Sequence, residues 1–220
     1  MKKENKNMPV KNIYPGKFIV FEGIDGSGKT TAAKMTADFL REKGYDVYET
    51  FEPTKESPAA GRIRNILESK EEAKADVLQE LFIEDRAYHV VKTLIPALGQ
   101  GKVVICDRYF FSTFAYGMAR GLEKDWFLEK HREILGENWI LPDLTVIIDA
   151  LPEIAAKRIT ERKAGRTIFE KELELAEKLR RNYLSFPDEF ENVRVVDGNR
   201  PPEEVLGDAV EIILPVLKTK

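Results

Sequence analysis

The chain has 220 residues, a length that corresponds to one large domain or two small ones and that is enough to bury a sizeable core. Hydrophobic residues make up 43% of it and charged residues 33%, a balance that excludes an intrinsically disordered chain. The 35 basic and 38 acidic residues leave a formal net charge of −3, which excludes a polycation built to bind nucleic acid or an anionic membrane. An anionic ligand must therefore meet positive charge that is concentrated locally.

The single cysteine and the polar N-terminus indicate a cytoplasmic protein. Cys106 cannot form an intrachain disulfide, which fits a reducing compartment, and it is expected to be a buried strand residue. The N-terminal segment lacks the apolar run of a secretory signal, and the sequence contains no stretch of about 18 apolar residues. Residues 1–16 are expected to form a polar, poorly ordered arm, followed by a single domain at residues 17–220.

From Lys17 onward, short apolar runs alternate with longer segments of helical period, a pattern typical of βα units in a parallel sheet. Strands are predicted at 18–21, 46–51, 102–106, 144–148 and 193–196. Helices are predicted at 30–43, 58–67, 74–98, 110–120, 125–135 and 169–183, from 152 into a basic stretch that ends at 166, and from 202 onward. We therefore expect an α/β fold with a mostly parallel, five-stranded sheet.

The strongest motif runs from Gly23 to Thr30 and fits the pattern G-x-x-x-x-G-K-[ST] between a predicted strand and a predicted helix. In this pattern backbone N–H groups surround phosphate oxygens, Lys29 reaches the outer phosphates and Thr30 can bind Mg²⁺. A glycine-rich turn without a ligand is the alternative, but both flanks have the strand–loop–helix order that the motif needs. The residues expected to bind the nucleotide are Gly23, Ile24, Asp25, Gly26, Ser27, Gly28, Lys29, Thr30 and Thr31.

A GTPase switch is a rival interpretation of this loop. It would need an Asn-Lys-x-Asp segment after a strand to read guanine, and the sequence has Asn-Lys only at Asn5-Lys6, upstream of the loop. The motif therefore favours a nucleoside triphosphate without indicating a GTPase.

Two strands end in an acid that could hold Mg²⁺ through water, at the sheet edge where α/β proteins bind ligands. Asp107 follows strand 102–106 and is itself followed by Arg108, which can bind a phosphoryl group. Asp149 ends strand 144–148 in the same manner and could instead cap the helix near Pro152. The adjacent arginine favours Asp107 as the metal-binding acid.

Phe82 and Arg86 lie four residues apart on predicted helix 74–98 and so project from one face. Together they suit a flat heterocycle with exocyclic oxygens. The spacing alone, however, favours a core phenylalanine beside a surface arginine that pairs with Glu84 or Asp85. Two histidines on predicted helices are expected to serve packing: His89 and His131.

Residues 157–166 contain five basic side chains and one acid, a formal charge of +4 in a chain whose total is −3. These side chains are Lys157, Arg158, Glu161, Arg162, Lys163 and Arg166. The segment is either a solvated basic face or part of a lid, at about 157–170, that closes arginines over a transferring phosphoryl group.

Four segments resemble the thymidylate kinase family of nucleoside monophosphate kinases: residues 21–31, 81–87, 107–116 and 162–172. The first is common to many NTP-binding proteins, whereas D-R-Y-x-x-S-x-x-A-Y joined to L-F-x-x-D-R-A is specific, and it favours a functional reading of Phe82 and Arg86. The resemblance extends from about residue 17 to the C-terminus. It implies a three-layer P-loop kinase fold with a helical lid, and transfer of the γ-phosphoryl group of ATP to dTMP, with Mg²⁺, in dTTP biosynthesis.

The resemblance also implies roles for individual residues. Phe82 stacks on thymine, Arg86 bonds its O4 edge, Thr113 faces N3, Tyr116 lies under the sugar and Asp25 holds the 3′-hydroxyl. Further substrate contacts are implied for Phe51, Arg108, Ser112 and Glu170. The implied catalytic residues are Lys29, Asp107, Arg108, Arg162 and Arg166, with Thr30 and Asp107 at the metal.

Three positions depart from the family pattern: Phe51 replaces the arginine of Arg-Glu-Pro, Gly117 replaces a glutamine, and Ile168 replaces the arginine before Phe-Glu. The phosphate loop carries no basic residue at its variable positions, so the lid must supply the catalytic arginine. The family also implies a homodimer acting on small molecules. A kinase for dUMP, UMP or CMP and a nucleotide-dependent interaction module are the alternative functions.

Overall fold

The computed structural model describes residues 8–162 and 170–218, and its centre is a five-stranded sheet in which every neighbouring pair of strands is parallel. The strand order is β3-β4-β2-β6-β7. The strands span Lys17–Glu22 (β2), Val47–Phe51 (β3), Val103–Asp107 (β4), Leu144–Asp149 (β6) and Val193–Asp197 (β7). Each lies within one residue of a strand predicted from the sequence, so the predicted α/β class is confirmed.

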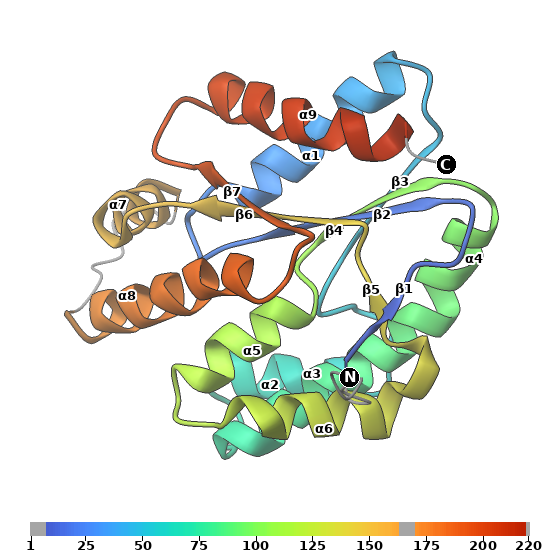
Figure 1. Ribbon diagram of the computed structural model, residues 1–220. Coiled ribbons are helices and arrows are strands. Elements are labelled where there is room, and N and C mark those ends of the chain that lie inside the picture. The colour runs from blue at the N-terminus through green and yellow to red at the C-terminus, as the bar shows by residue number, and fades with distance from the viewer. Residues whose placement is uncertain (1–7, 163–169, 219–220) are drawn as a thin grey trace.

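Helices cover both faces of the sheet and give the fold three layers (Figure 1). One face carries α1 (Lys29–Glu42) and α9 (Pro202–Lys218). The other carries α3 (Ala75–His89), α4 (Ile95–Gly99), α5 (Phe110–Met118), α6 (Lys124–Leu135) and α8 (Glu170–Ser185), with α2 (Ala60–Leu67) against α3 and α7 (Pro152–Arg162) beside α8. Short 3-10 turns follow α6 and α8, at Gly136–Asn138 and Phe186–Asp188. Among the described residues, no helix is both long enough and apolar enough to cross a membrane.

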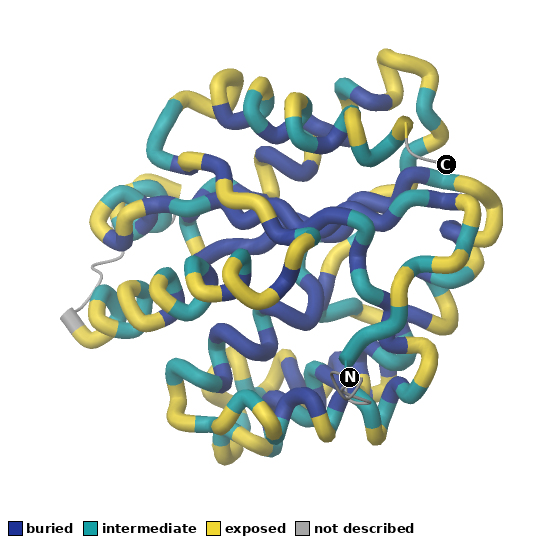
Figure 2. The backbone as a smooth tube through the Cα atoms, in the orientation of Figure 1, coloured by how far each residue is buried: buried dark blue, intermediate teal, exposed yellow. Residues whose placement is uncertain are grey.

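The continuous apolar runs of the sequence reflect strands that are buried on both faces (Figure 2). Along β2, Phe18 and Val20 pack under the helices of the α3 face, whereas Ile19 and Phe21 pack under α1 and α9. Successive side chains of a strand point to opposite faces, so a strand covered on both sides has no polar positions to alternate with. The sheet therefore holds its strand ends, and the residues just after them, in fixed positions.

The helix predicted over 74–98 is divided into three segments. Helix α3 ends at His89, a turn of π-helix spans Val90–Leu94, and α4 follows. Pro96 lies at the start of α4 and has no N–H group to donate back along the helix, so an uninterrupted α-helical hydrogen-bond ladder is not available here.

The expectation of a poorly ordered N-terminal arm is wrong for residues 8–16. Strand β1 (Val10–Lys11) pairs in parallel with β5 (Ile140–Leu141). Asn12 Nδ2 donates to Asp143 Oδ2 at 2.7 Å, and Gly16 N donates to the carbonyl oxygen of Leu98 at 2.9 Å. Residues 1–7 lie outside the described residues. The arm is therefore tied to the end of the sheet opposite the phosphate loop.

Candidate active site

The phosphate-loop motif lies where the sequence predicts it, between the end of β2 and the start of α1. Two of its glycines have left-handed backbones that other residues rarely adopt, with φ of 82° at Gly26 and 99° at Gly28. A Cβ atom at Gly26 would also lie 2.4 Å from the carbonyl oxygen of Ala155. Glycine therefore allows both the turn of the loop and the close approach of the loop to α7. The N-terminus of α1 faces the adjoining cleft.

This cleft, which we call the phosphate cleft, has a volume of about 800 Å³ and is lined by Asp25, Lys29, Thr30, Phe51, Asp107 and Arg108 among others. The side chain of Lys29 is only 8% exposed, and its Nζ lies 3.6 Å from Asp25 Oδ1. Burial, together with the charge of Arg108, lowers the pKa of Lys29 to about 8. The ammonium is thus desolvated and has room to gain partners from a bound phosphate.

Thr30 and Asp107 meet at the floor of the phosphate cleft. Thr30 Oγ1 donates to Asp107 Oδ2 at 2.5 Å, and Asp107 Oδ1 is buried without a hydrogen-bond partner. Mg²⁺ prefers oxygen ligands and commonly takes one or two from the protein beside nucleotide phosphates. The Thr30 hydroxyl and the Asp107 carboxylate fit such an ion. Among the described residues, no group of three or more His, Cys, Asp or Glu side chains could hold a metal ion.

Asp149, the competing acid, is engaged elsewhere. Its two oxygens accept from Arg180 of α8, from Nε at 2.6 Å and from Nη2 at 2.8 Å. Asp149 does not cap the helix that follows, because both of its carboxylate oxygens accept from Arg180, and the N–H of Leu151 just before the helix donates to Oδ1 of Asn199. The preference for Asp107 as the metal-binding acid thus has a structural reason, and the reading of Asp149 as a helix cap is wrong.

Arg108 has a left-handed backbone, with φ of 74°, which costs a residue with a Cβ about 1–2 kcal/mol. Three hydrogen bonds hold this conformation. Arg108 N donates to the carbonyl oxygen of Phe21 at 2.9 Å, Cys106 Sγ donates to the carbonyl oxygen of Arg108 at 3.0 Å, and Tyr109 N donates to Glu22 Oε1 at 2.8 Å. The turn directs the guanidinium back over the phosphate loop, where Nη2 lies 2.5 Å from Asp25 Oδ1.

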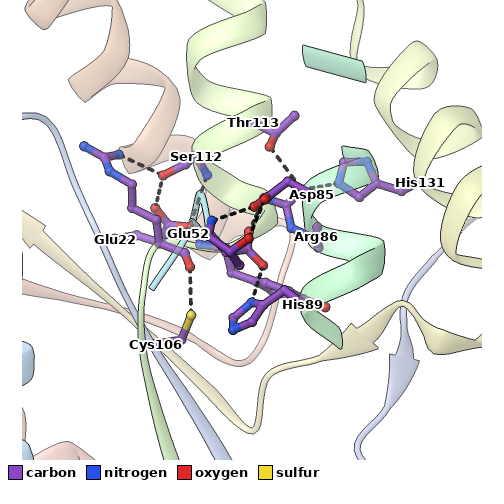
Figure 3. Close-up of polar contacts among 12 residues, drawn as sticks. Glu22, Glu52, Asp85, Arg86, His89, Cys106, Ser112, Thr113 and His131 are labelled. Carbon is purple, nitrogen blue, oxygen red and sulfur yellow. Dashed lines mark hydrogen bonds and ion pairs between the residues drawn. The ribbon is translucent and has the colours of Figure 1, made fainter. Parts of the chain in front are cut away.

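Glu22 is a fully buried carboxylate for which the sequence motifs predict no role, and Figure 3 shows the polar side chains around it. Its Oε1 accepts from the N–H groups of Tyr109 and Ser112, and its Oε2 accepts from the hydroxyl groups of Ser112 and Tyr183. Burial raises the pKa of Glu22, opposed by the charge of Arg108 and by these donors. Ser112 in turn accepts from Arg108 Nη1 at 2.9 Å, so Glu22 supports both the backbone and the side chain of that arginine.

A second cavity of about 230 Å³, the acceptor cavity, adjoins the phosphate cleft. Phe82, Arg86, Thr113 and Tyr116 all line it, as the family resemblance implies for a nucleoside site. The two hollows share lining residues, which are Asp25, Glu52 and Arg108. Four of the substrate contacts that the resemblance implies therefore lie together along one cavity.

The interpretation of Arg86 as a surface residue paired with Glu84 or Asp85 is wrong. Arg86 is 2% exposed, and its Nη2 lies 2.6 Å from Glu52 Oε2. Asp85 instead accepts from Thr54 and from the hydroxyl of Ser57. Burial of both partners of the Arg86–Glu52 pair makes the guanidinium a fixed part of the cavity wall.

Arg86 has two further partners, seen in Figure 3. Nη1 donates to Thr113 Oγ1 at 3.1 Å and lies 2.9 Å from Nε2 of His131, which is fully buried on α6. The guanidinium carbon is also 5.0 Å from the centre of the Tyr109 ring. His89, on the other side of the pair, lies 3.0 Å from Glu52 Oε1. Both histidines therefore belong to a buried polar network, which is more than the packing role predicted for them.

A model of the thymidylate kinase family matches residues 21–209. The chain belongs to the thymidylate kinase family. It is 42% identical over 205 residues to a protein of Pyrococcus horikoshii named probable thymidylate kinase, with 90% of this chain and 96% of the relative covered. A thymidylate kinase of Desulfotalea psychrophila is 36% identical over 208 residues, with 93% and 97% covered, and one of Ruegeria pomeroyi is 39% identical over 206 residues, with 90% and 95% covered. The resemblance drawn from the motifs is confirmed.

The thymidylate kinase pattern also implies roles for Asp25, Tyr116 and Phe51, which line different parts of the two hollows. Asp25 lies between the cations of Arg108 and Lys29, which outweigh the effect of its desolvation and bring its pKa to about 2. Tyr116 donates to Asp25 Oδ2 at 3.2 Å. Phe51 lines the phosphate cleft, where 45% of it is exposed, rather than the acceptor cavity.

The basic segment of this thymidylate kinase family member is described only in part. Arg158 donates to the carbonyl oxygens of Ser27 at 3.1 Å and Gly198 at 2.8 Å, so it ties α7 to the phosphate loop. Arg162 ends α7 and lines the phosphate cleft. Arg166 lies outside the described residues, and Glu170 is the first residue of α8.

The departure at Gly117 has a structural reason. A Cβ atom there would lie 2.1 Å from Cζ of Phe127, whose ring comes from α6. The fully buried ring of Phe127 takes the space that a side chain on this face of α5 would need.

Proposed function

We propose that this protein transfers the γ-phosphoryl group of ATP to dTMP and releases ADP and dTDP. The observation that carries this proposal is the junction of the two hollows, where the phosphate cleft and the acceptor cavity share Asp25 and Arg108. A phosphate donor in the first and a nucleotide in the second would bring their phosphates together at that junction. Membership of the thymidylate kinase family supports the same reaction.

The phosphate loop and Lys29 hold the donor. The loop N–H groups and the desolvated ammonium bind the phosphates of ATP, which restore to Lys29 partners that burial has removed. Thr30 and Asp107 would hold Mg²⁺, which neutralises charge on the phosphates when bound.

The acceptor cavity selects a flat base. Phe82 offers a ring for stacking, and Arg86 and Thr113 offer hydrogen bonds to the carbonyl oxygen and N3 of a thymine. Asp25 and Tyr116, which bond each other, lie where the sugar would join the two hollows. Arg108 binds the acceptor phosphate and orients its oxygen.

The chemical step is an in-line displacement. An oxygen of the acceptor phosphate forms a bond to the γ-phosphorus as the bond to the β–γ bridging oxygen breaks, and the departing electron pair remains on ADP. Positioning and charge stabilisation account for most of such catalysis. Arg108 supplies charge from the sheet edge, and Arg162 or Arg166 supplies it from the lid at about 157–170.

A panel of nucleoside monophosphates with ATP and Mg²⁺ tests the acceptor. dTMP should give the highest kcat/KM, measured by ADP release. Turnover of UMP or CMP without turnover of dTMP would contradict the assignment and favour a related kinase. Calorimetry with a nonhydrolysable ATP analogue tests the interaction-module alternative, which expects no binding of dTMP.

Two substitutions test the lid. Arg162→Ala and Arg166→Ala should differ, with the catalytic arginine losing mainly kcat, on the order of 10³-fold. If both variants keep the wild-type kcat, the lid does not supply the charge.

We further propose that residues 17–220 act as one catalytic domain and that the protein is a cytoplasmic homodimer. The family resemblance supports the dimer, and the single cysteine supports a reducing compartment. Light scattering after gel filtration tests the assembly, because a chain of 25.2 kDa that remains monomeric at assay concentrations would contradict it.

A further inference from the structure

The buried surroundings of Arg86 include a partner that lies outside both hollows. Three side chains from separate elements bond the guanidinium: Glu52 after β3, Thr113 on α5 and His131 on α6. Glu52 and Thr113 line the acceptor cavity, whereas His131 lies behind Arg86 and lines neither hollow. His131 can therefore influence a bound nucleotide only through Arg86.

The contacts of His131 determine the position of its proton. Nδ1 lies 2.7 Å from the carbonyl oxygen of Phe127, which can only accept, so Nδ1 carries the hydrogen. Nε2 lies 2.9 Å from Nη1 of Arg86, which can only donate, so Nε2 is the acceptor. Both contacts are satisfied only by a neutral ring protonated at Nδ1. Burial and the charge of Arg86 lower the pKa of His131 well below its usual value, which keeps the ring neutral.

Aromatic rings hold the plane of His131. Its ring is stacked on Trp139, with centroids 4.7 Å apart and an interplanar angle of 29°. Phe114 contacts it edge-on at 5.3 Å and 70°. Because the ring is enclosed and hydrogen-bonded to its own helix, Nε2 is a fixed acceptor.

His131 adds a second hydrogen bond to one nitrogen of Arg86. Glu52 forms an ion pair with Nη2, and Thr113 Oγ1 accepts from Nη1. His131 Nε2 accepts from the same Nη1, so both N–H groups of that nitrogen are held, by side chains from α5 and α6. The N–H of Nε is buried without a hydrogen-bond partner, and Nη2 has a second N–H beyond its ion pair with Glu52.

We propose that His131 is a positioning residue for base selection: its neutral Nε2 fixes the plane of Arg86 so that the free N–H donors address a carbonyl oxygen of the pyrimidine. An amino group in place of that carbonyl, as in cytosine, cannot accept these donors. His131 thus favours thymine over cytosine without touching either. This inference rests on the proposed function, because it takes a pyrimidine nucleotide as the acceptor.

Three variants separate this role from a structural one. His131→Phe keeps an aromatic ring but has no acceptor, His131→Gln brings an amide oxygen close to the place of Nε2, and Trp139→Phe alters the same aromatic cluster without removing the acceptor. The measurements are kcat and KM for dTMP and dCMP, KM for ATP, and the thermal midpoint.

His131→Phe should raise the KM for dTMP about 10-fold, the size of one hydrogen bond to a charged group, and should lower the preference for dTMP over dCMP by a similar factor. The kcat for dTMP and the KM for ATP should stay within about 2-fold of the wild type, because Arg86 does not touch the reacting phosphates. His131→Gln should keep most of the preference, and Trp139→Phe should keep all of it.

An unchanged preference in His131→Phe would overturn the inference, as would equal losses in every kinetic constant together with a lower thermal midpoint. The tautomer gives a test that needs no folded variant. Imidazole ¹⁵N shifts of the wild-type protein, which has 2 histidines, should report a protonated Nδ1 and an unprotonated Nε2 at His131, and the opposite tautomer would refute the proposal. Wild-type protein that does not phosphorylate dTMP contradicts the proposed function itself, whatever the variants do.

Discussion

Thr30 and Asp107 are joined by a hydrogen bond of 2.5 Å that links the first turn of α1 to the last residue of β4. The bond places one hydroxyl and one carboxylate oxygen beside the phosphate loop at a fixed separation. A metal bound there would be held from two elements of the central layers rather than from a loop.

Asp107→Asn should raise the Mg²⁺ concentration needed for half-maximal activity by about 10-fold or more, because an amide lacks the charge that attracts the ion. The matched control is Asp149→Asn, which changes the other strand-end acid but one already bonded to Arg180. Initial rates at fixed ATP and varied free Mg²⁺ provide the measurement. Equal shifts in the two variants would contradict the assignment of the metal to Asp107.

Arg108 gives a prediction about stability. Arg108→Ala and Arg108→Gly both lose the guanidinium, but glycine adopts a φ of 74° without the steric cost that alanine has. The glycine variant should therefore be more stable than the alanine variant by about 1 kcal/mol, and both should lose most activity. Urea denaturation compares the two free energies of unfolding. A more stable alanine variant would mean that the turn is not strained.

Lys29 combines a cost in stability with a role in turnover. Its pKa is lowered from 10.5 to about 8, so the unfolded chain binds more protons between these values and the free energy of unfolding should rise over that pH range. The desolvated ammonium costs about 3 kcal/mol at neutral pH. Lys29→Met should therefore have a thermal midpoint at pH 7 at least as high as that of the wild type, while kcat falls on the order of 10²- to 10³-fold.

Lys34→Met is the matched control for Lys29→Met. Lys34 also lines the phosphate cleft, but its side chain is 69% exposed and pairs with Asp38. Neither its thermal midpoint nor its kcat should change appreciably. A wild-type kcat in Lys29→Met would remove this lysine from the mechanism.

His131 predicts a pH dependence of stability. The pKa of the folded residue lies well below the usual 6.5, so below that pH the unfolded chain takes up a proton that the folded ring cannot. His131 should therefore lower the free energy of unfolding by up to about 1.4 kcal/mol per pH unit as the pH falls below 6.5. Urea denaturation from pH 7 to pH 5 should give a shallower decline for His131→Gln, and parallel curves would mean that His131 takes up its proton in the folded state.

The sheet could be predicted from the sequence because local information is enough for it. A strand covered on both faces, such as the one containing Ile19 and Val20, reads as an unbroken apolar run between turn residues. The N-terminal arm has no such signal. The N–H of Val10 donates to the carbonyl oxygen of Trp139, which lies far along the chain. Only the tertiary fold therefore orders the arm.

The candidate site divides in the same way. Residues inside contiguous motifs, such as Lys29 and Arg108, could be placed at one cleft from the sequence, and both line it. The partners of Arg86 could not, because Glu52 and His131 come from distant positions and a lone histidine on a helix is more often a packing residue. The sequence around Glu22 did carry a signal. An acid at the end of an apolar run is costly to bury unless hydrogen-bond donors surround its carboxylate, so its position indicates a buried polar site.

The contact between Gly117 and Phe127 has a consequence for the size of the residues that α5 and α6 can carry. Since a Cβ at position 117 would enter the space of the Phe127 ring, a larger residue at 117 needs either a smaller residue at 127 or a displacement of that ring. The reverse does not hold, because glycine at 117 is compatible with any smaller residue at 127.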